Sequence, residues 1–319
     1  MEAVESISIQ DIEAARGRLE GLAARTPLVQ LDVDDAPADI YLKLENLQPI
    51  GSFKVRGAGN AMRSNPTALS RGVFTASAGN MGQGVAYVAR ELGVEAAVVV
   101  PDHAPATKLR AMERLGAKVV KVPFDEWWQV LVTHEFPGLS GAFIHPVSSS
   151  DVIAGNGTAG LEIIEDCPDV DSIVVPYGGG GLSCGIATAV KARKPDVKVY
   201  AAEVDTAAPL AASLAAGRPT SIDYTPSFVD GIGGKSVLPE MWPMVRELLA
   251  GSLVVTLEEI ASAIRLLVER NRLIAEGAGA TSVAAALAGQ AGGGKVVAVV
   301  SGGNIDSDKL SKILAGKLP

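Results

Sequence analysis

The residue with the clearest chemical potential is a lysine in an apolar setting. Lys54 lies between Phe53 and Val55, in a segment that follows an amphipathic strand predicted at 41–45 and a turn at 48–51. Burial of an ammonium group favours its neutral form, which lowers the pKa of the amine and makes it a nucleophile toward an aldehyde. A surface lysine whose stem packs on apolar neighbours would have the same local sequence. The other motifs of the chain must decide between these two interpretations.

The most specific motif is a run of four glycines between an apolar segment at 173–175 and a helix expected to open near Ser183. The run and its next residue are Gly178, Gly179, Gly180, Gly181 and Leu182. Without Cβ atoms, the N–H groups of such a loop can close around a phosphate, and the helix N-terminus adds to the attraction. The spacing matches neither the Walker motif nor GxGxxG. The run therefore predicts a phosphate-binding loop of another class.

Two further motifs follow predicted strands. Ser77, Ala78, Gly79 and Asn80 lie between a strand at 73–76 and a helix at 85–92, where backbone N–H groups can bind a carboxylate. An ordinary capped turn would look the same. Ser301 directly follows an apolar strand at 296–300, and α/β proteins bind their ligands at the carboxyl ends of such strands. The alternative role for Ser301 is a helix N-cap.

The elements that must position these motifs alternate between strand and helix. One series has strands at 73–76, 96–100 and 119–122 with helices at 85–92 and 106–115; a second has strands at 173–175, 199–202 and 296–300 and a long helix at 257–271. A first helix is expected from Ser8, capped with Asp11, to Pro27. These βαβ units predict two parallel sheets in two α/β domains, with ligands in the cleft between them.

Composition narrows the class of function. The 319 residues carry 36 Asp and Glu against 28 Lys and Arg, a net charge of −8, which argues against a nucleic-acid or anionic-membrane surface. The apolar runs are too short to span a bilayer, and the N-terminus does not read as a signal peptide. Two cysteines and three scattered histidines suggest no disulfide framework or metal cluster. A small-molecule enzyme of the reducing cytoplasm is expected.

In this order, the motifs resemble the fold-type II, tryptophan synthase β-like enzymes that use pyridoxal 5′-phosphate (PLP). Within them, the chain is most similar to the branch of threonine/serine dehydratases (threonine ammonia-lyases) and serine racemases. The resemblance runs from Thr26 to Asn304. It implies two parallel-sheet α/β domains with the cofactor between them. The large PLP-binding domain would comprise residues 1–66 plus 149–319, and the small domain 67–148.

The resemblance also implies a role for each motif. Lys54 would form the Schiff base with PLP, Phe53 would pack near the ring, and Asn80 would hydrogen-bond the 3′-oxygen. The glycine run with Leu182 would hold the phosphate, and Ser301 would meet the pyridine nitrogen. Glu276 resembles the family acid near the far side of the cofactor. The loop Ser77, Ala78, Gly79 and Asn80 would bind the substrate carboxylate.

The activity implied is β-elimination of L-threonine or L-serine to a 2-oxo acid and ammonia. Racemases of this branch have a second serine where this chain has Ala78, so racemisation should be weak. The alternatives are an amino-acid racemase, or a dehydratase for a substituted serine such as 3-phenylserine or 3-hydroxyaspartate. Outside this class, a catalytically silent phosphate-binding protein is disfavoured, because such a protein would need none of Lys54, Asn80 and Ser301.

One acidic residue bears on a possible metal site, and the resemblance bears on partners. Glu203 matches the first ligand of a divalent-cation site found in several relatives, but Pro209 stands where a second acidic ligand is expected. A site without that carboxylate should bind Mg²⁺ or Ca²⁺ poorly. By the resemblance, the protein should be a homo-oligomer, either a dimer or a tetramer. The chain ends at Pro319, so no carboxy-terminal regulatory domain is expected.

Overall fold

The fold is built on two separate β-sheets. The structure is a computed structural model that describes residues 3–104 and 106–319. Within these residues, six strands form one sheet in the order β1-β2-β10-β7-β8-β9, in which only β1 and β2 pair antiparallel. Its strands are β1 (Leu28–Gln30), β2 (Asp39–Lys43), β7 (Ser172–Pro176), β8 (Lys198–Val204), β9 (Gly251–Val255) and β10 (Lys295–Val299).

The second sheet has four parallel strands in the described part of the chain, in the order β5-β4-β3-β6. They are β3 (Val73–Ala76), β4 (Ala96–Pro101), β5 (Lys118–Val122) and β6 (Ala142–Phe143). All four come from one continuous stretch of the chain, whereas the six-stranded sheet takes strands from both sides of that stretch. The two parallel-sheet α/β units expected from the sequence are confirmed, with one antiparallel strand at the edge of the larger sheet.

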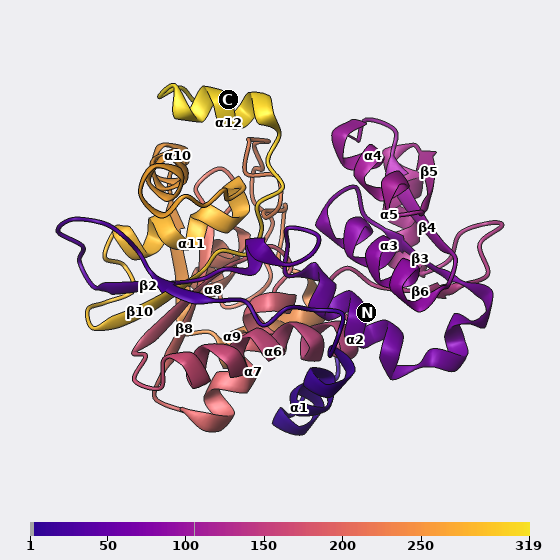
Figure 1. The fold of residues 1–319 in the computed structure, drawn as a ribbon, viewed down its shortest axis with the longest axis horizontal. Helices are drawn as coiled ribbons and strands as arrows, with labels where there is room; N and C mark the ends of the chain where they lie inside the picture. The colour runs from indigo at the N-terminus through magenta and orange to yellow at the C-terminus, as the bar shows by residue number, and fades with distance from the viewer. Residues whose placement is uncertain (1–2, 105) are drawn as a thin grey trace.

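Helices cover both sheets (Figure 1). In Figure 1, α6 and α7 lie below the six-stranded sheet and α10 and α11 above it, while α3, α4 and α5 surround the smaller sheet. The α-helices are α1 (Ile9–Arg18), α2 (Lys54–Ser64), α3 (Asn80–Leu92), α4 (Ala106–Arg114), α5 (Phe124–Thr133), α6 (Ser150–Asp166), α7 (Gly181–Arg193), α8 (Pro209–Ala216), α9 (Trp242–Leu248), α10 (Leu257–Leu266), α11 (Gly277–Leu287) and α12 (Ser307–Leu314). Shorter turns of helix are η1 (Glu45–Leu47), η2 (Pro66–Arg71), η3 (Pro239–Met241) and the π-helical η4 (Leu267–Asn271).

Apolar runs form the strands at the centre of each sheet because both of their faces are covered. β4 and β10 are almost entirely buried, as expected for parallel strands that lie between two layers of helices. The predicted strands at 73–76, 96–100, 119–122, 173–175, 199–202 and 296–300 all coincide with observed strands to within two residues at each end. The sequence therefore predicted the central strands well.

The first helix differs from its prediction at one end. Ser8 caps it with the expected capping box to Asp11, but the helix stops at Arg18 rather than continuing to Pro27. Leu19 and Leu22 are buried in the turns that follow, where Gly21 takes a positive φ of 76°. Glycine adopts this left-handed conformation readily, and such residues often follow the end of a helix. The apolar spacing thus extends into the turns, which is why it predicted a longer helix.

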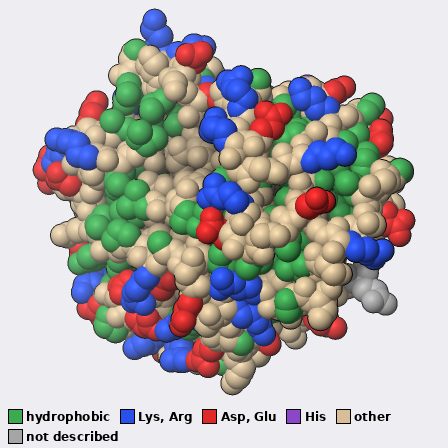
Figure 2. Space-filling model, turned by 45° about the vertical axis from the view of Figure 1, so that its right-hand side comes forward, with side chains coloured by type: hydrophobic (Ala, Val, Ile, Leu, Met, Phe, Trp, Pro, Cys, Tyr) green, Lys and Arg blue, Asp and Glu red, His purple; other side chains and the backbone are tan. Residues whose placement is uncertain are grey.

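The surface carries charged side chains of both signs (Figure 2). On the face drawn in Figure 2, Lys and Arg side chains are interspersed with Asp and Glu and form no basic patch. Among the described residues, no helix is both long and apolar enough to cross a membrane.

Candidate active site

One cavity brings the predicted site residues together. It has a volume of about 790 Å³ and lies where strands of both sheets end, at Ala76 and Pro101 on one side and Pro176 and Ser301 on the other. Every residue predicted to hold the cofactor or the substrate lines it: Phe53, Lys54, Ser77, Ala78, Gly79, Asn80, Gly178, Gly179, Gly180, Gly181, Leu182, Glu276 and Ser301. Glu203, the predicted metal ligand, does not line the cavity.

Lys54 is the first residue of α2, and its partly buried side chain reaches into the cavity. Its Nζ donates a hydrogen bond to the Pro146 carbonyl oxygen at 2.7 Å and lies 5.1 Å from the centre of the Phe53 ring. Burial lowers the pKa of Lys54 to about 8, while the Glu276 carboxylate acts in the opposite direction. A substantial fraction of the amine is therefore neutral near pH 8 and available as a nucleophile.

The acceptor for Lys54 is held in place by a histidine that the sequence analysis did not single out for a role. Nδ1 of His145 accepts hydrogen bonds from the N–H groups of Val147 at 3.1 Å and Ser148 at 2.6 Å. Burial lowers the pKa of His145 to about 4, with smaller contributions from His134 and Lys54, so the ring is neutral and its Nδ1 can accept. These bonds fold the loop that presents the Pro146 carbonyl to Lys54.

The glycine run forms a close-fitting loop at the start of α7. Gly180 takes a positive φ of 95°, a conformation that side-chain-bearing residues rarely adopt. A Cβ on Gly179 would lie 2.5 Å from Cγ1 of Val147. Gly180 is thus required by the backbone conformation, and Gly179 by the close approach of the Val147 side chain. The loop places its N–H groups and the N-terminus of a 13-residue helix at the cavity wall.

A chain of hydrogen bonds joins the asparagine loop to the opposite wall. Asn80 Nδ2 donates to Oε1 of Glu276 at 2.7 Å, and Asn304 Nδ2 donates to Oδ1 of Asn80 at 2.8 Å. Glu276 precedes α11 and is 5% exposed. Burial raises the pKa of Glu276 to about 7, so this carboxyl can change its protonation state near neutral pH. Asn304 belongs to the motif after β10 but was not predicted to reach Asn80.

Ser301 is fixed against the segment that carries Lys54. The N–H of Phe53 donates to the Ser301 carbonyl oxygen at 3.0 Å, and Ser52 pairs with Gly302 in an isolated β-bridge. A Cβ on Gly302 would lie 2.5 Å from Oε1 of Glu276. The motifs of Lys54 and Ser301, the first and the last along the chain, are therefore neighbours in space.

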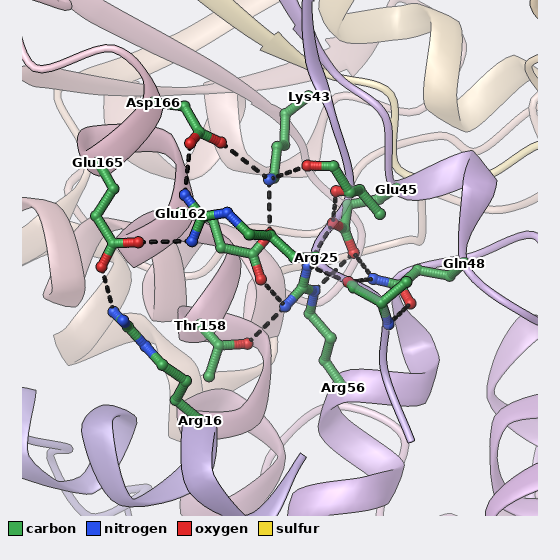
Figure 3. A network of polar contacts seen from close by, with 12 residues as sticks. Arg16, Arg25, Lys43, Glu45, Gln48, Arg56, Thr158, Glu162, Glu165 and Asp166 are labelled. Atoms are coloured by element: carbon green, nitrogen blue, oxygen red, sulfur yellow. Dashed lines mark hydrogen bonds and ion pairs between the residues drawn. The ribbon is translucent and has the colours of Figure 1, made fainter. Parts of the chain in front are cut away.

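Buried ion pairs anchor the helix that begins at Lys54 (Figure 3). Arg56, 2% exposed, donates to both carboxylate oxygens of Glu45 at 2.8 Å and to those of Glu162 at 2.7 and 2.9 Å. Lys43 Nζ lies 2.6 Å from Glu162. The segment 41–45 was predicted as an amphipathic strand, but Lys43 and Glu45 are both fully buried. The polar face is covered by α2 and α6, which supply the opposite charges.

The residues around Glu203 do not fit a divalent cation. Its Oε1 accepts the Leu210 N–H at 2.9 Å, and its Oε2 accepts the Ala211 N–H at 2.8 Å and the Ser252 hydroxyl at 2.5 Å. The carboxylate thus caps the N-terminus of α8, where N–H donors and the positive end of the helix dipole disfavour a cation. In the described residues, no group of three or more His, Cys, Asp or Glu side chains could hold a metal ion.

Together, the cavity between two parallel-sheet units, the buried amine and the glycine loop define a PLP enzyme of fold type II. The family described as "Pyridoxal-phosphate dependent enzyme" matches residues 19–302, and the chain belongs to it. It is 41% identical to L-threonine ammonia-lyase from Thermotoga maritima, over 97% of this chain and 78% of that protein. It is 38% identical to a putative threonine dehydratase from Sinorhizobium fredii, over 99% of this chain and 98% of that protein.

Solved structures give the same family. Maize serine racemase matches with a TM-score of 0.88 at 32% identity, covering 98% of both chains. The processed form of threonine deaminase isoform 2 from Solanum lycopersicum matches with a TM-score of 0.86 at 33% identity, covering 99% of this chain and 96% of that chain. Both likenesses extend over nearly the whole molecule, which confirms the resemblance drawn from the motifs.

The cavity fits PLP. The glycine loop is a cradle in which a Cβ on Gly179 would meet Val147, and it lies at a helix N-terminus, which suits a phosphate. Beside it, Oδ1 of Asn156 is buried and has no hydrogen-bond partner among the described residues, although Asn156 lines the cavity. An anion site and an amine in one cavity are the two groups that PLP requires.

Proposed function

We propose that this chain catalyses the PLP-dependent β-elimination of L-threonine or L-serine, which yields a 2-oxo acid and ammonia. The observation that carries the proposal is the placement of Lys54, with its lowered pKa, in one cavity with the glycine loop and the Ser77–Asn80 segment. The names of the relatives from Thermotoga maritima and Sinorhizobium fredii support the same reaction.

PLP, when bound, supplies an electron-withdrawing ring that acidifies the Cα–H bond of an amino acid. In the proposal, Lys54 holds the cofactor and then takes the Cα proton on its Nζ. The N–H groups of residues 178–182 would bind the phosphate, and Phe53 would pack near the ring. The Ser301 hydroxyl would be the partner of the pyridine nitrogen, and a neutral partner there would favour elimination.

The segment Ser77–Asn80 is proposed to bind the substrate carboxylate. It connects β3 to the N-terminus of α3, where backbone N–H groups and the helix dipole attract an anion. Ala78 carries no proton donor, so the face of Cα opposite Lys54 lacks a group at this position that could return a proton. Elimination is therefore favoured over racemisation, which is kept as the second candidate because serine racemases are among the similar structures.

The direct test is 2-oxo acid release by the PLP-loaded protein. We expect release from L-threonine and L-serine and little from their D and allo forms. Chiral analysis of the unreacted serine separates the candidates, since a racemase would accumulate D-serine without releasing pyruvate. A protein that stays colourless with added PLP and releases no product would contradict the proposal and favour a silent phosphate-binding protein.

The organisation of the molecule belongs to the proposal as well. We place the large domain at residues 1–66 plus 149–319 and the small domain at 67–148, supported by the origin of the four-stranded sheet within 73–143. We also propose a homo-oligomer, a dimer or a tetramer, which light scattering of the purified protein would test. A cytoplasmic location accords with Cys167 and Cys184, which are buried and free.

A further inference from the structure

One wall of the cavity is more apolar and aromatic than threonine or serine requires. Phe124, Trp127 and Leu131 line it and lie three and four residues apart on α5, so they share one face of that helix. The ring centres of Phe124 and Trp127 are 5.5 Å apart, and the His103 ring lies 6.1 Å from Phe124. These rings form a continuous surface beside the end of β4. In Figure 1, α5 belongs to the smaller sheet unit, opposite the helices of the six-stranded sheet.

This wall retains apolar surface that a ligand could bury. Phe124 is 50% exposed although it lines a cavity, and Nε1 of Trp127 is buried with no hydrogen-bond partner among the described residues. An aromatic ring placed against such a surface gains both buried area and ring-ring contact. The cavity volume of about 790 Å³ must contain the cofactor as well as the substrate. It is the half-exposed Phe124 ring, rather than the volume, that offers a larger substrate a surface to contact.

The charges in the cavity argue against an acidic side chain. Among the described residues that line it, the Lys and Arg side chains are those of Lys54 and Lys108. Lys54 is assigned to the cofactor, and Nζ of Lys108 lies 3.1 Å from Oδ2 of Asp230. Glu276 adds a further carboxyl to the same cavity. A second substrate carboxylate, as in 3-hydroxyaspartate, would thus find no unpaired lysine or arginine there.

We propose that the site also accepts β-hydroxy amino acids with an aromatic group on Cβ, whose ring lies against Phe124, Trp127 and Leu131. The inference rests on the proposed β-elimination. For L-threo-3-phenylserine, the Cα–H and Cβ–O bonds break and water leaves. Hydrolysis of the resulting imine consumes one water and releases phenylpyruvate and ammonia. No oxidant or reductant is required.

The test compares kcat/KM for L-threo-3-phenylserine and L-threonine in the PLP-loaded protein and three variants. We expect the wild type to release phenylpyruvate. Phe124→Ala and Trp127→Ala should lower kcat/KM for 3-phenylserine about tenfold while that for L-threonine changes little. Trp128→Ala is the matched control: it removes a 46% exposed tryptophan of the same helix that does not line the cavity, and both activities should persist.

Binding gives a second readout that does not require elimination. L-Phenylalanine has the ring but no leaving group, so it should inhibit L-threonine turnover competitively. Its inhibition constant should be larger in Phe124→Ala, because the inhibitor binds that variant more weakly. That variant alters an exposed ring, so it tests the wall even where Trp127→Ala fails to fold. Turnover of L-threonine without turnover of 3-phenylserine would overturn the inference alone. Absence of turnover with both substrates would overturn the proposed function. An equal loss of kcat/KM for both substrates in Phe124→Ala would show that Phe124 does not bind the substrate ring.

Discussion

Lys54 has the two properties that a cofactor lysine needs, a reachable amine and a lowered pKa. Its hydrogen-bond partner is the Pro146 carbonyl oxygen rather than a carboxylate, so no direct ion pair with a described residue holds the ammonium form. Burial lowers its pKa to about 8. Glu276 opposes that shift, because a negative charge in the same cavity favours the ammonium. The amine therefore changes its protonation state within the range where such enzymes are assayed.

The first prediction concerns the pH dependence of cofactor capture. Only the neutral amine attacks the aldehyde of PLP, so the rate of PLP uptake by the apo-protein should rise about tenfold per pH unit below pH 8 and level off above it. Visible absorbance after rapid mixing measures that rate. Lys54→Ala should abolish both the absorbance change and turnover. A rate that keeps rising to pH 10, as for an ordinary lysine, would show that burial does not lower this pKa.

The second prediction concerns His145 and acid stability. Its pKa is about 4 in the folded protein and about 6.5 in an unfolded chain, so between these values the unfolded state binds more protons. The contribution of His145 to the free energy of unfolding is therefore fully present above pH 6.5 and is lost as the pH drops toward 4. The loss from this group is at most about 3 kcal/mol. Urea unfolding of the wild type and His145→Asn across this range measures it. Asparagine offers an acceptor that does not titrate, so parallel curves would contradict the assignment.

At the scale of elements, α2 is fixed by the charges around Arg56. Burial acts to raise the pKa of Glu45, but the charge and hydrogen bonds of Arg56 hold that pKa below its usual value. The cluster connects α2 with η1 and, through Glu162, with α6. Since Lys54 begins α2, the position of the reactive amine depends on this buried cluster as well as on its own contacts.

The third prediction compares a buried and an exposed arginine. Arg56→Met leaves Glu45 and Glu162 buried without their main partner, which should lower the free energy of unfolding by about 3–5 kcal/mol. Arg25→Met removes ion pairs to Glu165 and Asp166 in which the arginine is half exposed, and should cost less than about 1 kcal/mol. Urea unfolding at pH 7 measures both. Equal losses would indicate that burial of the cluster is not what stabilises α2.

The same cluster shows what the sequence could and could not predict. Apolar runs predicted the central strands, because a strand buried on both faces is recognisable from its own residues. The alternation at 41–45 predicted a strand with a polar face but could not show that Glu162 and Arg56 cover that face. The motif residues were found because their types suit the chemistry. The contact between Asn304 and Asn80 and the His145 loop depend on packing between distant segments, which no local pattern records.

For the whole molecule, both sheets direct the carboxyl ends of parallel strands toward one cavity. This arrangement brings residues from β3, β7 and β10 together although they are far apart in the chain. Glu203 lies on β8, a neighbour of β7 in the same sheet, yet its side chain is used to cap α8. The cofactor site and the Glu203 site are thus separate, and the chemistry of one need not depend on a ligand at the other.

The last prediction follows from that separation. Removal of divalent cations with EDTA should leave kcat/KM for L-threonine and the melting temperature unchanged, because N–H and hydroxyl donors already satisfy both carboxylate oxygens of Glu203. Glu203→Gln replaces a charged cap by a neutral one and should lower the melting temperature, and neither Mg²⁺ nor Ca²⁺ should affect the wild type or the variant. Turnover assays and thermal unfolding of the PLP-loaded protein, with and without each cation, measure this. A cation that raises activity or melting temperature in the wild type but not in Glu203→Gln would show that Glu203 binds metal and that α8 is capped otherwise in solution.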